Sequence, residues 1–136
     1  MTLLTWETLA AVAVGGAAGA VLRVVSSSWI ARLGHPAWLP ADFPSATLLV
    51  NVAGSLAIGV LYVVLVERLA ASLPLRGLLM AGLLGGFTTF SAFALETLLL
   101  VESDEPLRAG AYVAASVVLC LAACLAGAAL ARQLTP

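Results

Sequence analysis

The residues from Gly85 to Phe93 combine types and spacing that could do chemistry. They read Gly-Gly-Phe-Thr-Thr-Phe-Ser-Ala-Phe, which places two glycines and three hydroxyls inside an otherwise apolar stretch long enough to cross a membrane. In hydrocarbon, irregular backbone is tolerated only where it is buried in protein or lines a watery cavity or ion site. The run therefore predicts a membrane helix with a break at 85–88, located where the protein handles an ion.

Side chains that suit a small anion occur in and around this run. An anion leaving water needs hydrogen-bond donors and positive potential. Phenyl rings carry a positive edge, so Phe90 and Phe93 could meet an anion edge-on, although packing residues have the same pattern. Asn51 is either a donor to the anion or a hydrogen bond between helices. The candidate pathway residues are Arg23, Asn51, Thr89, Phe90, Ser91, Phe93, Tyr112 and Ser116.

The same break could attract a cation. Backbone carbonyls released at Gly85 and Thr88 would face it, whereas the half-helix that follows begins with a positive dipole end. The residues alone leave open whether such an ion is transported or structural. We expect Glu96 to form a charge pair with Arg23, in preference to acting as a proton carrier.

The composition defines the elements that must position these residues. The chain has 136 residues, of which 62% are hydrophobic and 10% are charged, so we expect an all-α integral membrane protein. A span needs about 20 apolar residues. Four stretches meet that need, at about 5–29, 45–66, 75–101 and 108–131, within a single transmembrane domain over 1–136. The sequence lacks a nucleophile–base constellation and a nucleic-acid patch, so we expect neither an enzyme nor a nucleic-acid partner.

The arginines give little orientation bias. If the N-terminus, the 67–76 connector and the C-terminus share one side, three arginines (Arg68, Arg76 and Arg132) lie there, against Arg32 and Arg108 on the other. Lys/Arg asymmetry in short loops sets topology. The chain is therefore a candidate for insertion in both orientations, and a weakly biased single topology is the alternative.

The predicted polar groups gather in one half of the membrane and converge on the break. One subunit would thus supply half of a polar route, and a second, inverted copy would supply the other half. We therefore expect an antiparallel homodimer in contact with membrane lipid.

Three motifs together resemble the Fluc (CrcB) fluoride channel family. They are Gly15–Arg23 (GGAAGAVLR), Thr47–Gly54 (TLLVNVAG) and Gly85–Phe93 followed by Glu96. The resemblance implies a dual-topology homodimer in the cell inner (plasma) membrane of a bacterium. Such a channel passes cytoplasmic fluoride outward passively, rejects chloride and gives fluoride resistance.

The resemblance also assigns residues. Phe90 and Phe93 match the family's paired pore phenylalanines, and Asn51 matches its pore asparagine. The backbone carbonyls of Gly85 and Thr88 match a central structural Na⁺ site. Tyr112 and Ser116 match a polar track on the last helix, where Cys120 stands in place of a frequent hydroxyl.

Two other classes are compatible with four apolar helices. A small multidrug-type proton-coupled exporter resembles this chain in size, but it uses a buried acidic residue in its first helix. Here Glu7 lies at the edge of that helix and its buried charge is Arg23. A non-transporting assembly subunit would not need the break with its glycines and hydroxyls.

Overall fold

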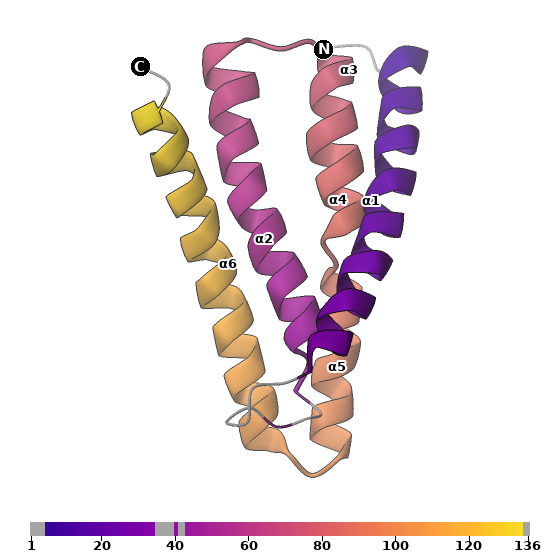
Figure 1. The fold of residues 1–136 in the computed structure, drawn as a ribbon, viewed down its shortest axis with the longest axis vertical. Coiled ribbons are helices and arrows are strands. Elements are labelled where there is room, and N and C mark those ends of the chain that lie inside the picture. The colour runs from indigo at the N-terminus through magenta and orange to yellow at the C-terminus, as the bar shows by residue number, and fades with distance from the viewer. Residues whose placement is uncertain (1–4, 35–39, 41–42, 135–136) are drawn as a thin grey trace.

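The computed structural model describes residues 5–34, 40 and 43–134. Within these residues, four helices are long and apolar enough to cross a membrane. They are Trp6–Leu33, Ser45–Arg68, Leu73–Glu102 and Pro106–Leu134. The protein is thus an all-α, multi-pass membrane protein, as its composition predicts. Helix α1 begins and α6 ends at the same end of the bundle, which Figure 1 shows at the top.

Each span is built from one or more helical elements. Helix α1 is Trp6–Leu33, and α2 (Ser45–Leu61) continues as the π-helix η1 (Tyr62–Arg68). The third span contains α3 (Leu73–Arg76), the π-helix η2 (Gly77–Leu84), α4 (Gly85–Phe87) and α5 (Phe90–Glu102), and the fourth is α6 (Pro106–Leu134). These spans extend slightly beyond the apolar stretches because local signals set their ends. Thr5 accepts a hydrogen bond from Thr8 N–H at the start of α1, and Pro106 occupies the first position of α6.

The break lies later in the chain than the sequence predicts. Gly85 and Gly86 remain helical, whereas Thr88 and Thr89 adopt extended backbone, with φ/ψ of −82°/156° and −149°/118°. An added Cβ at Gly86 would lie 2.5 Å from the carbonyl oxygen of Gly16, so this glycine allows α1 to pack closely. The expected break at 85–88 therefore holds at Thr88 but not at residues 85–87, and the observed break is Thr88–Thr89.

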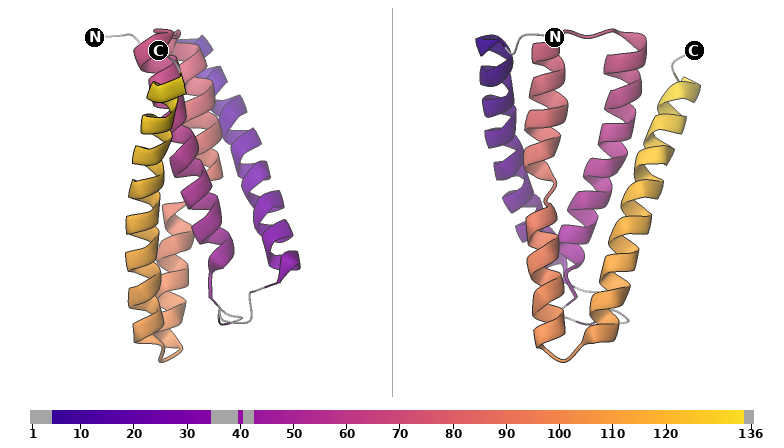
Figure 2. Two further views of the ribbon diagram at one scale, coloured as in Figure 1. Left: turned by 60° about the vertical axis from the view of Figure 1, so that its left-hand side comes forward. Right: turned by 180° about the vertical axis from the view of Figure 1, so that it is seen from behind.

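The helices pack mainly as two pairs. Helix α1 lies along η2 and α4, and α2 lies along α6, while α5 meets α6 at the other end through a short turn (Figures 1 and 2). The α2–α6 seam depends on Gly59 and Gly127, where an added Cβ would collide with the backbone of the facing helix. Backbones approach closely across such small residues in membrane proteins.

One cluster of buried residues lies on the α5–α6 side of the bundle. It contains Phe93, Leu100, Ala109 and Tyr112, with Phe43 and Leu48 packed against it. Most large apolar side chains instead point outward, such as Trp29 on α1 and Leu125 on α6. This surface is suited to lipid or to another apolar protein surface.

Candidate ion pathway

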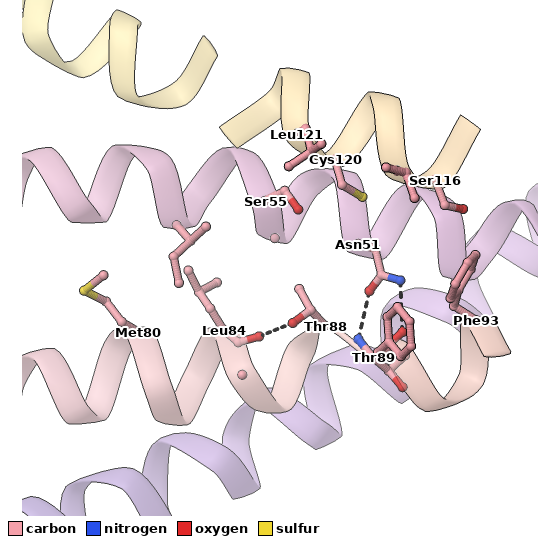
Figure 3. Close-up of a pocket in the computed structure, with 15 residues that line it drawn as sticks. Asn51, Ser55, Met80, Leu84, Thr88, Thr89, Phe93, Ser116, Cys120 and Leu121 are labelled. Atoms are coloured by element: carbon pink, nitrogen blue, oxygen red, sulfur yellow. Dashed lines mark hydrogen bonds between the residues drawn. The ribbon is translucent and has the colours of Figure 1, made fainter. Parts of the chain in front are cut away.

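The side chain of Asn51 on α2 hydrogen-bonds the extended backbone at the break. Its Oδ1 accepts a hydrogen bond from Thr89 N–H at 2.8 Å, and its Nδ2 donates to the Thr89 carbonyl at 3.0 Å (Figure 3). Both backbone groups of Thr89 are therefore satisfied without helical partners. One N–H of the Asn51 amide stays outside this pair and can donate to a ligand.

The two threonines of the break cap the helices on either side. Thr88 donates from both its backbone N–H and its hydroxyl to the Leu84 carbonyl, each at 2.9 Å, which closes the first half of the span. Thr89 Oγ1 accepts from Ala92 N–H at 3.1 Å and caps α5. The Thr89 hydroxyl also lies 3.2 Å from the hydroxyl of Ser91.

Because of the Asn51 bond and the Thr89 cap, two backbone carbonyls have no helical N–H donor. In a continuous α-helix the amides of Thr89 and Ala92 would donate to the carbonyls of Gly85 and Thr88. Those amides donate instead to Asn51 Oδ1 and Thr89 Oγ1. The carbonyls of Gly85 and Thr88 thereby lose their helical donors, and Gly85 is exposed on the surface of this chain.

Arg23 and Glu96 do not form the expected charge pair. Arg23 Nε donates to the Gly86 carbonyl at 3.2 Å. Glu96 accepts hydrogen bonds at 2.6 Å from both Thr47 Oγ1 and Tyr112 Oη. The prediction was wrong because it used depth in the membrane alone. Glu96 is turned toward α2 and α6, whereas Arg23 on α1 meets the end of α4.

These bonds also change the expected role of Tyr112. Its hydroxyl is fully buried and donates its hydrogen to Glu96, so it has none left for an anion. Thr47 completes the Glu96 site, although it was not among the predicted functional residues. The available signal was its position four residues before Asn51, on the same face of α2.

The two phenylalanines lie together after the break. The ring centroids of Phe90 and Phe93 are 5.1 Å apart, with an interplanar angle of 53°. Phe93 is 9% exposed and also contacts the ring of Tyr112, with centroids 5.3 Å apart. Phe90 is 79% exposed, so its ring lies on an open face of the chain.

A cavity of about 430 Å³ connects these residues between the third span, α2 and α6. Figure 3 shows Asn51 at its centre, Phe93 at one end and Met80 toward the other. Of the predicted site residues, it is lined by Asn51, Gly85, Thr88, Thr89, Phe90, Phe93 and Ser116. Arg23, Ser91 and Tyr112 are outside this set.

The wall on α6 contributes Ser116 and Cys120, one helical turn apart. Ser116 is 7% exposed, and within the described residues its Oγ lacks a hydrogen bond of good geometry. Cys120 is a free, partly buried thiol. On α2, Ser55 adds a further hydroxyl to the lining. The rest is mainly apolar, had no chemical signal in the sequence, and includes Ile58, Leu84, Val117 and Leu121.

The described residues contain no group of three or more His, Cys, Asp or Glu side chains that could hold a metal. A cation at this site would therefore depend on backbone and hydroxyl oxygens, which are ligands for hard cations.

Residues 10–128 match the family model of the CrcB-like protein, Camphor Resistance (CrcB). A Methylococcus capsulatus protein named fluoride-specific ion channel FluC is 48% identical over 126 residues, which are 93% of this chain and 53% of that protein. The chain thus spans about half the length of this relative. FluC proteins of the same name from Rhizobium etli and Azotobacter vinelandii are 49% and 50% identical, over 94% and 90% of their lengths and 90% and 86% of this chain. These names describe an ion channel and not an enzyme. The match covers all four spans, and the chain belongs to the CrcB family.

Proposed function

We propose that this protein is a fluoride-selective channel that lets cytoplasmic fluoride leave the cell passively and so gives fluoride resistance. The observation that carries the proposal is the cavity in which Asn51, Ser116 and the rings of Phe90 and Phe93 meet at the helix break. The names of the relatives, which belong to fluoride-specific ion channels, support the choice of ion.

Fluoride is small and strongly hydrated, so its pathway must replace water with other donors. Asn51 has one N–H outside its bonds to Thr89, and the Ser116 hydroxyl is buried at the cavity wall. The hydroxyls of Thr89 and Ser91, which flank Phe90 in the sequence, lie 3.2 Å apart. The Arg23 guanidinium supplies positive potential at the end of α4.

The phenyl rings can assist where donors are sparse. The edge of a phenyl ring is electropositive, and two rings 5.1 Å apart at 53° offer edges in different directions. A constriction between such rings favours an ion that fits closely. Chloride is larger, and although it costs less to dehydrate, it would fit less closely between the rings and these donors.

Passive export needs no coupled proton or ATP. Fluoride accumulates inside cells because neutral hydrogen fluoride crosses the membrane and then dissociates. A selective pathway lets the anion leave down its own gradient. The Glu96 carboxylate is held by two hydroxyl donors, and we assign it to fixing Thr47 and Tyr112, not to carrying protons.

We further propose that the working unit is an antiparallel homodimer of dual topology, embedded in lipid. The cavity is open, and the ring of Phe90 at its edge is 79% exposed, so this face is suited to a second apolar surface. The near balance of arginines between the two ends of the bundle favours insertion in both orientations.

A structural sodium ion fits the donors at the break. The carbonyls of Gly85 and Thr88 have lost their helical donors, and Gly85 is exposed toward the proposed partner. Oxygen ligands of this kind suit a hard cation. A sodium ion there would stabilise the unpaired carbonyls where two breaks cross.

The test is ion efflux from liposomes that contain the purified full chain. We expect rapid fluoride efflux and chloride efflux near that of protein-free liposomes. Measurement at pH 7.5 keeps hydrogen fluoride permeation low, and protein-free liposomes give its rate. Fluoride efflux equal to that control would overturn the proposal.

A further inference from the structure

Arg23 occupies a specific position relative to the break. The first half of the third span ends at Phe87, and its last carbonyls lack helical donors. One of them, the Gly86 carbonyl, accepts from Arg23 Nε at 3.2 Å. Arg23 reaches it because Gly16 and Ala20, on the same face of α1, lie directly against Gly86.

The charge of Arg23 is balanced by the helix end and not by a carboxylate. Within the described residues, neither of the salt bridges that the structure records involves Arg23, and Glu96 is engaged by Thr47 and Tyr112. The C-terminal end of a helix carries about half a negative charge. A guanidinium there stabilises this end, and in a membrane interior the interaction is weakly screened.

The neighbouring carbonyls are those proposed to hold sodium. Gly86 lies next in sequence to Gly85 and two residues before Thr88, so the guanidinium and the sodium ion would share one helix end. Two cations on adjacent carbonyls repel each other. The Gly86 carbonyl, bonded to Arg23 on the α1 side, is also withdrawn from the set of sodium ligands.

We infer that Arg23 is a fixed cation of the break, which holds the Gly86 carbonyl and weakens sodium binding at the adjacent carbonyls of Gly85 and Thr88. This inference rests on the proposed sodium site. It makes Arg23 a positioning residue whose charge keeps the break positive toward fluoride even when sodium is scarce.

The test compares the sodium response of full-length variants in detergent. The thermal midpoint of unfolding is measured against NaCl, with N-methylglucamine chloride holding ionic strength constant, because a ligand of the folded state raises stability with its concentration. For Arg23→Gln we expect the sodium concentration at half-maximal stabilisation to fall at least about threefold, since a like charge is removed. Arg23→Lys should respond as wild type, and Arg32→Gln, on the exposed end of α1, is the matched control.

A second variant keeps the inference testable if Arg23→Gln does not fold. The variant Arg23→His replaces the permanent charge by an imidazole, and histidine side chains ordinarily change charge near pH 6.5. In Arg23→His, sodium should therefore bind more tightly at pH 8.5 than at pH 5.5, with no such difference in wild type.

A purely structural Arg23 predicts the opposite sign, because a disordered break would bind sodium more weakly. If the sodium concentration at half-maximal stabilisation is unchanged or higher in Arg23→Gln, this inference is overturned, whereas the proposed sodium site is not. The absence of any sodium response in wild type would overturn both this inference and the proposed sodium site. Fluoride efflux, measured separately, would still decide the channel function.

Discussion

Asn51 hydrogen-bonds both backbone groups of Thr89, with its Oδ1 2.8 Å from the amide nitrogen and its Nδ2 3.0 Å from the carbonyl oxygen. This is possible because Thr89 is extended, at φ −149° and ψ 118°, so its N–H and C=O point to the same side as in a strand. A primary amide provides one acceptor and two donors at a matching separation. Asn51 thus holds two helices together and also keeps one donor beside the cavity.

Replacing Asn51 by aspartate should stop fluoride transport. The carboxylate keeps an acceptor for Thr89 N–H but loses both amide donors, and it places a negative charge against the Thr89 carbonyl. We expect fluoride efflux to fall at least about tenfold, and the free energy of unfolding to fall by about 1–3 kcal/mol. Asn51→Gln, which keeps both groups on a longer side chain, should retain more efflux than Asn51→Ala. Wild-type efflux and stability in Asn51→Ala would contradict this role.

The two glycines before the break should differ in their tolerance of alanine. An added Cβ at Gly86 would meet the Gly16 carbonyl oxygen at 2.5 Å, whereas at Gly85 the nearest atom beyond its own helical turn, Met80 O, is 3.8 Å away. We therefore expect Gly86→Ala to lower the thermal midpoint of the folded chain and Gly85→Ala to leave it unchanged. Thermal unfolding in detergent measures both.

Gly85→Val then reports on the proposed partner and sodium site. A bulky side chain at this exposed position should weaken dimerisation and the sodium response without unfolding the chain, while Thr88→Ala should keep much of the sodium response. Size-exclusion chromatography with light scattering gives the oligomeric state. A dimeric Gly85→Val variant with the sodium response of wild type would count against a close crossing of two breaks.

The sequence predicted the spans well because their signals are local. Each span needed only an apolar run that ends at charges or at residues such as Pro74 and Pro106, and the structure extends these runs by a few residues. The predicted break at 85–88 overlaps the observed one only at Thr88, because the two glycines were included in it. Gly86 is instead needed for the close approach of α1 at Gly16, which lies 70 positions earlier in the sequence.

The sequence predicted which residue types form the site but not which way their side chains point. Asn51, Phe90, Phe93 and Ser116 line one cavity as their chemistry suggests. The contact of Arg23 with Gly86, and of Glu96 with Tyr112, depends on how each helix is rotated about its axis. Depth along a helix is readable from sequence position, but rotation relative to three neighbours is set by packing.

Loss of the Tyr112 hydroxyl should affect both stability and transport. Tyr112 is fully buried and donates to Glu96 Oε2 at 2.6 Å, while Thr47 serves the other carboxylate oxygen. In Tyr112→Phe one oxygen of the carboxylate loses its donor, which costs about 1–3 kcal/mol. We also expect slower fluoride efflux, because the carboxylate charge becomes less compensated. Tyr62→Phe, at a position that is 46% exposed, is the control and should match wild type in both measurements.

Dual topology predicts that each terminus is accessible from both sides of the membrane. A single cysteine is placed at either terminus in a background without Cys120 and Cys124, and intact cells are treated with a membrane-impermeant thiol reagent. About half of the protein should be labelled from outside, and the rest only after the membrane is opened. Labelling from one side alone would exclude the antiparallel dimer.

The two phenylalanines should separate a role in ion passage from a role in packing. Isoleucine keeps much of the apolar bulk but lacks the electropositive ring edge. Phe90 is 79% exposed, so Phe90→Ile should leave the stability of the single chain almost unchanged while fluoride efflux falls sharply. Phe93 is 9% exposed and packs on Tyr112, so Phe93→Ile should lose efflux and also about 1–3 kcal/mol of stability.

Phe87 provides the matched control for these variants. It ends α4 and lies outside the Phe90–Phe93 pair, so Phe87→Leu should keep efflux near wild type. Efflux is compared at equal amounts of monodisperse protein, which excludes misfolding as the cause of a loss. If both Phe90→Ile and Phe93→Ile transport fluoride like wild type, the rings serve packing alone. The anion route would then have to follow the hydroxyl side of the cavity along Ser116 and the α6 wall.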